Sequence, residues 1–95
     1  MRYVWDPTKD ILNQRNHHLS LEDGIPALED PNGQAWSDTR FDYEEERTIN
    51  LGRGKRTILL VVSIEQDEEK EETIRILSVR KATRNEESWY YFGRT

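Results

Sequence analysis

Four cationic side chains gather between residues 75 and 86, where the sequence predicts that a β-strand ends and a helix begins. Arg75, Arg80 and Lys81 surround the apolar run that starts at Ile76, and Arg84 follows closely. In an alternating strand Arg80 shares a face with Ile76, where a guanidinium is costly unless it is paired or meets an anion. Arg84 adds a cation near the positive end of a helix, which favours an external anion. These residues predict a site for the phosphate groups of a nucleic acid.

The aromatic residues that follow allow two interpretations. Trp89, Tyr90 and Tyr91 have the flat rings on which nucleic acid bases stack. Alternatively, these rings belong to the core and Arg80 pairs with an internal glutamate. For the aromatic residues we favour the core.

The sequence predicts neither a metal site nor a cofactor. His17 and His18 are adjacent, so on a rigid helix they point in different directions and cannot bind one ion together. A solvated helix end explains His18, whereas a functional role for His17 stays equally open. The acidic residues at 42–45 fit a solvated strand start. The acidic run at 65–72 fits a loop, because it lacks the spacing of a calcium-binding loop.

The net charge is unevenly distributed along a chain of 95 residues, which we expect to form one domain over residues 1–95. Six acids and one lysine at 65–72 give −5, the net charge of the whole chain, so the other residues sum to zero. From residue 73 onward, five cations and two glutamates give +3. There is no cysteine, signal peptide or long apolar run, so we expect a cytoplasmic protein that does not enter the membrane.

The N-terminal third predicts one strand and two helices. A strand at 2–5 leads to Asp6 and Pro7, which read as the N-cap and first residue of a helix. Ile11, Leu12 and Arg15 give that helix a narrow apolar stripe, and it ends at 16–18. A second helix starts after Ser20, paired with Asp23 in a pattern close to a capping box, and Gly24 and Pro26 keep it short or bent.

The remainder predicts four strands and a last helix. After a turn at 30–33, we expect strands at 34–37, 45–51, 57–64 and 72–80, with the third central in the sheet. Residues 52–55 read as a hairpin loop whose glycines adopt positive φ. Thr83 and Glu86 form a capping-box pattern that opens a helix over 84–91. The predicted class is α+β, with two N-terminal helices packed on one face of an antiparallel sheet in the order β-α-α-β-β-β-β-α.

Several motifs in chain order resemble the BrnT family of toxins. Residues 5–17 resemble W-D-x-x-K-x-x-x-N-x-x-K-H, and 20–23 resemble S-F-E-E. Asp30 and Pro31 come next, followed by Glu46, Arg47 and Gly52, which are similar to E-R-x-x-x-x-G. The long stretch at 75–86 resembles R-I-I-S-A-R-K-A-T-x-x-E, which is specific enough to identify the family.

The resemblance implies a RelE-like fold and a metal-independent endoribonuclease that inhibits translation. It also implies a BrnA-like antitoxin that neutralises the toxin and alone contacts operator DNA. RNA cleavage needs a base, an acid and a cation for the phosphorane. For phosphate binding and charge stabilisation we select Arg47, Arg80 and Arg84. For proton transfer we leave His17, Glu46 and Lys81 open. Further RNA contacts are expected at Arg53, Lys55, Arg75 and Trp89.

A second function from another class stays open. Asn16 and His18 replace a lysine and a glycine of the family motif, and the acidic net charge differs from that of most RNA-cleaving relatives. The alternative is a toxin-fold protein with weak or no activity that acts as a binding partner in an autoregulatory DNA-binding complex.

Overall fold

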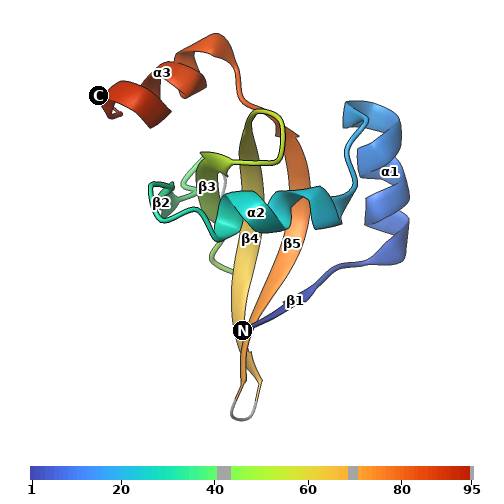
Figure 1. The fold of residues 1–95 in the computed structure, drawn as a ribbon. Coiled ribbons are helices and arrows are strands. Elements are labelled where there is room, and N and C mark those ends of the chain that lie inside the picture. The colour runs from blue at the N-terminus through green and yellow to red at the C-terminus, as the bar shows by residue number, and fades with distance from the viewer. Residues whose placement is uncertain (41–43, 69–70, 95) are drawn as a thin grey trace.

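The computed structural model describes residues 1–40, 44–68 and 71–94. Its element order confirms the predicted α+β class (Figure 1). The elements are β1 (Arg2–Val4), α1 (Pro7–His17), the 3-10 helix η1 (Leu21–Gly24), α2 (Ile25–Leu28), β2 (Gln34–Ser37), β3 (Thr48–Arg53), β4 (Ile58–Glu68), β5 (Glu71–Lys81) and α3 (Arg84–Phe92).

The strands form one sheet in the order β1-β5-β4-β3-β2, so the apolar strand β4 is central as predicted. Three pairs are antiparallel, and β1 alone pairs in parallel, with Tyr3 opposite Ile74. The sheet is therefore mixed, although most of it is antiparallel. A parallel partner is possible at this edge because the long connection from β1 to β5 does not impose the geometry of a hairpin.

The local helix signals are confirmed. The Asp6 side chain accepts a hydrogen bond from the Thr8 amide at the start of α1, and the helix ends at His18, which adopts a left-handed conformation with φ of 59°. Ser20 and Asp23 form a complete capping box. The second helix is short, as expected from its glycine and proline, and consists of a 3-10 turn followed by α2.

The two N-terminal helical segments contact the sheet differently. The η1–α2 segment crosses one face, whereas α1 lies beside β5 at the edge of the sheet (Figure 1). Under η1 and α2 lies the larger core, which consists of Leu21, Ala27, Leu59, Val61, Ile76 and Val79. A smaller cluster on the opposite face contains Ile49, Leu60 and Val62, with Trp36 and Leu77 packed against it.

The predicted apolar stripe of α1 is wrong. Ile11 is 58% exposed and Leu12 is 47% exposed, while the buried residue of the helix is Asn13. The Asn13 amide nitrogen donates to the carbonyl oxygen of Val79 at 2.9 Å, and its oxygen accepts from the Val79 amide at 3.0 Å. Asn13 therefore pairs with the edge of β5 beyond the end of β1, as a neighbouring strand would. The helix is held by polar pairing at this edge, so apolar periodicity could not reveal its buried side.

The predicted hairpin at 52–55 is also corrected. Strand β3 begins at Thr48 and runs to Arg53, so Gly52 belongs to the strand. Neither Gly52 nor Gly54 has positive φ; among the described glycines only Gly93 does, at 91°. Gly52 instead allows a close approach, because a Cβ at that position would collide with the carbonyl oxygen of Ala27 in α2. Its small size brings the helix onto β3.

The acidic run at 65–72 is not simply a loop. Residues 65–68 of β4 pair with residues 71–74 of β5, and from residue 72 toward its tip this two-stranded ribbon extends beyond β1, which pairs with β5 from Thr73 to Arg75 (Figure 1). Residues 69–70, like 41–43 of the predicted acidic strand start, lie outside the described residues. Glu44 and Glu45 are exposed, as expected for a solvated segment. Glu65, Glu71 and Glu72 are exposed, which is compatible with acidic strand residues near the end of a projecting hairpin.

Candidate functional site

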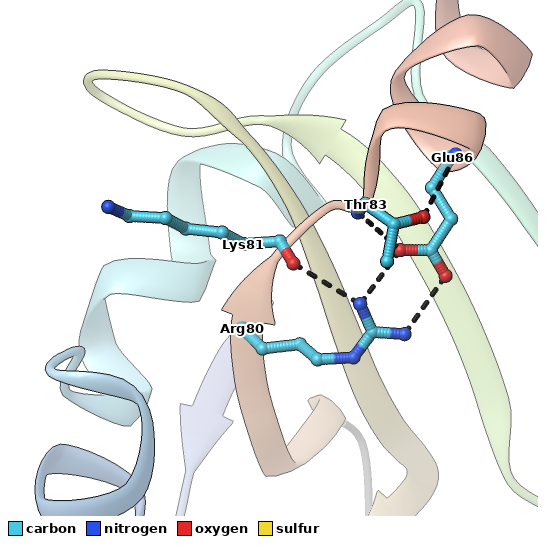
Figure 2. Close-up of polar contacts among 4 residues, drawn as sticks. All are labelled: Arg80, Lys81, Thr83 and Glu86. Carbon is cyan, nitrogen blue, oxygen red and sulfur yellow. Dashed lines mark hydrogen bonds and ion pairs between the residues drawn. The ribbon is translucent and has the colours of Figure 1, made fainter.

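A register shift in β5 decides where the predicted cations point. Val62 pairs with Ser78 and Ser63 pairs with Ile76, so Leu77 is an extra residue in the ladder. Because of this bulge, Ile76 and Val79 both face the helices. Arg80 lies opposite Leu60 on the other face, so the prediction that it shares a face with Ile76 is wrong. Lys81, the next residue, points in the opposite direction from Arg80 (Figure 2).

Arg80 is held by a bidentate ion pair with Glu86. Its Nη1 donates to Oε1 of Glu86 at 2.7 Å, and its Nη2 donates to Oε2 at 2.9 Å (Figure 2). Nη1 also donates to the carbonyl oxygen of Lys81 at 3.2 Å. These bonds use three of the five guanidinium N–H groups and leave two without a partner among the described residues. With its side chain 33% exposed, Arg80 is oriented by the protein and still open to solvent.

Glu86 links the ion pair to the start of α3. Its Oε1 accepts from the Thr83 amide at 2.8 Å, and its own amide donates to the Thr83 hydroxyl at 3.2 Å, which completes the predicted capping box. The hydrogen bonds from Arg80 hold the pKa of Glu86 below its usual value, against the opposing effect of burial. Glu86 is therefore ionised at neutral pH, and its arrangement fits a residue that orients Arg80 better than one that transfers protons.

Arg84 stands at the first position of the nine-residue helix α3 and is exposed. The Arg84 side chain makes no ion pair with another described residue. Together with the solvent-facing side of Arg80, it places two guanidinium groups at the junction between β5 and α3. We refer to Arg80, Arg84, Thr83 and Glu86 as the junction site. Such a pair of cations, close to a helix N-terminus, suits a phosphodiester.

The aromatic residues of α3 contact the protein itself, but they are not the buried core residues that the favoured interpretation predicted, since Trp89 and Tyr90 are half-buried and Tyr91 is 57% exposed. The half-buried Trp89 ring meets Trp36 edge-on at 6.1 Å between centroids. Tyr90 donates its hydroxyl to Asp30, which raises the pKa of Tyr90. Arg53 donates to the Tyr91 hydroxyl at 3.0 Å. These contacts attach α3 to the edge of the sheet formed by β2 and β3, and they occupy Arg53 and Trp89, which we had selected for RNA contacts.

Glu46 and Arg47 lie away from the junction site. Both come before Thr48, the first residue of β3. Leu51, further along β3, pairs with Leu60 of β4, which in turn pairs with Arg80 of β5. Leu51 and Arg80 therefore lie at the same level of the sheet. Arg47 comes four positions before Leu51, which is about 14 Å in an extended strand. Arg47 and Arg80 therefore lie at different levels of the sheet, and an RNA strand could cross both. The exposed Glu46 carboxylate accepts a hydrogen bond from Ser37 at 3.3 Å.

Arg75 is likewise separate from Arg80. It is exposed on β5, where its partner on β1 is Val4, five residues before Arg80 in the same strand. The predicted set of cations is thus spread along the sheet. Of this set, Arg80, Lys81 and Arg84 lie where β5 leads into α3, with the side chains of Arg80 and Lys81 pointing in opposite directions.

On the helix face, a cleft of about 870 Å³ opens beside Lys81. We call it the hairpin cleft, because Lys55 and Arg56 of the β3–β4 hairpin are among the residues that line it. Lys55 and Lys81 were predicted for RNA binding and catalysis, whereas Arg56 was missed. The only available signal for Arg56 was its position in a basic pair after Gly54. His18 also lines the cleft, while the exposed His17 is not among its lining residues.

Neither a metal-binding group of side chains nor a membrane-spanning helix occurs among the described residues. No group of three or more histidine, aspartate or glutamate side chains is placed to hold a metal ion within this part of the chain. No helix in it has both the length and the hydrophobicity needed to cross a membrane.

Comparison with known protein families identifies the class. Residues 5–86 match the family described as the ribonuclease toxin BrnT of type II toxin–antitoxin systems. The match covers most of the chain, including the whole of β5 and the Arg80–Glu86 pair. The chain belongs to the BrnT family of ribonuclease toxins, as the sequence motifs predicted. Comparison with curated proteins gives no match.

Proposed function

We propose that this toxin cleaves RNA at the junction site without a metal ion. The observation that carries the proposal is the Arg80 guanidinium, which is fixed by Glu86 and keeps two N–H donors directed away from that pair. Arg84 adds a second cation at the same junction. Two guanidinium groups can stabilise the charge of a phosphorane when they are already oriented, because little reorganisation is then needed.

The proposed reaction is attack by the RNA 2′-hydroxyl on the adjacent phosphorus, with departure of the 5′-oxygen. Arg80 and Arg84 bind the non-bridging oxygens in this scheme. Glu86 positions Arg80 and remains ionised throughout. Proton transfer stays unassigned among the three predicted residues: Lys81 points away from Arg80, His17 ends α1, and Glu46 precedes β3. Arg47 and Arg75 fit contacts to neighbouring phosphates of the same strand better than contacts to the scissile one.

We also propose that cleavage inhibits translation in the cytoplasm and that a BrnA-like antitoxin neutralises the toxin. Membership of a type II toxin–antitoxin family supports a protein antitoxin and an RNA substrate. Contact with operator DNA is proposed to occur only through the antitoxin. The polarised charge supports this division, because the acidic ribbon at 65–72 would be repelled by DNA.

A second candidate function is an inactive toxin-fold partner in an autoregulatory complex. Two observations favour it: Arg80 already has an internal partner, and Trp89 packs on Trp36. Both residues therefore have a structural role that does not require RNA.

Controlled expression in a bacterial host separates the two functions. If the chain is an active ribonuclease, its induction should arrest growth, and the Arg80→Ala variant at equal protein level should not. The Arg15→Ala variant, which removes an exposed cation of α1, serves as the matched control and should arrest growth like the wild type. A harmless wild type would favour the inactive partner and contradict the proposal.

A further inference from the structure

The hairpin cleft has a composition that neither the catalytic proposal nor the core accounts for. Three cations line it, Lys55 and Arg56 from the hairpin and Lys81 from the end of β5. None of the three has an ion-pair partner in the described part of the chain. Three like charges around one cleft repel each other, so an anionic group that enters it would be attracted.

The floor of the cleft is aliphatic. Leu19, Ile25 and Pro26 line it together with Leu59, which is buried in the core beneath. Nucleic acid bases bind best on aromatic rings, and the residues that line this cleft include none apart from the imidazole of His18. An aliphatic floor instead suits the apolar side chain of a peptide.

The cleft is also lined by two carboxylates, which disfavour RNA. Glu22 and Asp23 line it, and the Asp23 carboxylate already accepts a hydrogen bond from the Ser20 amide at 2.8 Å. Two carboxylates would repel a phosphate backbone that ran through the cleft. A peptide can complement both the cations and the carboxylates of the cleft, because its own acidic and basic side chains can be placed separately.

We propose that the hairpin cleft binds a segment of the cognate antitoxin, which places an apolar side chain on the Leu19–Ile25 floor and acidic residues against Lys55, Arg56 and Lys81. This inference rests on the proposed function, because it assumes a protein antitoxin. Lys81 lines the cleft and directly follows Arg80, but the two side chains point in opposite directions (Figure 2). A bound segment would therefore lie at the same end of β5 as the junction site, on the other face of the sheet.

The test compares two charge reversals in the full-length toxin. Arg56→Glu changes a cleft residue that is exposed and was not selected for RNA binding. Lys9→Glu changes an equally exposed cation of α1, with the same change in net charge. The probe is the protein encoded beside the toxin gene, purified separately, and its affinity is measured by titration calorimetry at two salt concentrations.

We expect Arg56→Glu to weaken binding at least tenfold, with a smaller salt dependence than the wild type, and Lys9→Glu to change it less than threefold. No binding to the wild type, or equal effects of the two substitutions, would overturn the inference. RNA cleavage is measured in parallel on the free proteins. If Arg56→Glu abolishes cleavage and leaves antitoxin affinity unchanged, the cleft belongs to RNA and the inference is wrong. A wild type that binds the antitoxin through Arg56 but cleaves no RNA would contradict only the proposed function.

Discussion

Arg80 shows how a residue can have a structural and a chemical role at once. The sequence left two alternatives, an external anion or an internal glutamate, and the structure supplies the internal glutamate. The two alternatives are compatible, because a bidentate pair uses only part of the donor capacity of a guanidinium. Glu86 was recognisable as a capping residue, but its partner was not, since the bulge at Leu77 that turns Arg80 toward α3 has no sequence signature.

The two arginines of the junction site should differ in their effect on stability. Arg80→Ala leaves the buried Glu86 carboxylate without its main partner, so we expect a loss of about 1–3 kcal/mol in the free energy of unfolding. Arg84 is exposed at the helix start, so Arg84→Ala should stay within about ±0.5 kcal/mol of the wild type. Urea denaturation followed by circular dichroism measures both values. Equal effects would show that the ion pair contributes nothing.

Glu86 should give the protein a measurable acid sensitivity. Its pKa is lowered from 4.5 on folding, so the unfolded chain takes up the proton first as the pH falls. The stabilisation is therefore complete above the unfolded pKa and is lost as the pH drops through the folded pKa. The difference in unfolding free energy between the wild type and Glu86→Gln should be constant above about pH 5.5 and shrink below about pH 4.5. A difference that does not change with pH would refute the role of the Glu86 charge.

At the scale of elements, helix capping was predictable and the attachment of the elements to one another was not. Asp6, Ser20 and Thr83 act locally, so their helix starts could be predicted from neighbouring residues. Asn13 acts on a strand 66 residues away in sequence, and no local pattern marks that contact. Ile11 and Leu12 have the spacing of a buried apolar stripe but are exposed, so the prediction of which side of α1 is buried was wrong.

The helix α1 should consequently depend on an amide more than on its apolar side chains. Asn13→Ala removes both hydrogen bonds to Val79 and the bond to the Leu19 carbonyl oxygen. Buried backbone groups of β5 are then left unsatisfied, so we expect a loss of about 2–4 kcal/mol of stability. Ile11→Ser, on the exposed side, should change it by no more than about 0.5 kcal/mol. The reverse ranking in thermal or urea unfolding would restore the apolar-stripe interpretation.

At the scale of the whole molecule, charge is separated along the long hairpin of β4 and β5. The acidic ribbon projects at one end, and the junction site and hairpin cleft lie at the other, where β5 leads into α3 (Figure 1). The sequence revealed this polarity directly, because the acidic run and the basic stretch are each continuous. It could not show that Arg80 and Lys81 serve opposite faces, since that depends on the pleat and bulge of a single strand.

The most direct test is cleavage of an unstructured RNA by the purified toxin in the presence of EDTA. Arg84→Ala is the decisive variant, because Arg84 is exposed and its loss should not disturb folding. Arg15→Ala, an exposed cation of α1, is the control. We predict that the wild type and Arg15→Ala cleave at similar rates without metal. Arg84→Ala should be at least tenfold slower with an unchanged circular dichroism spectrum, which corresponds to about 1.4 kcal/mol of transition-state stabilisation. Cleavage that requires a metal ion, or equal rates for all three proteins, would contradict the junction site as the centre of catalysis.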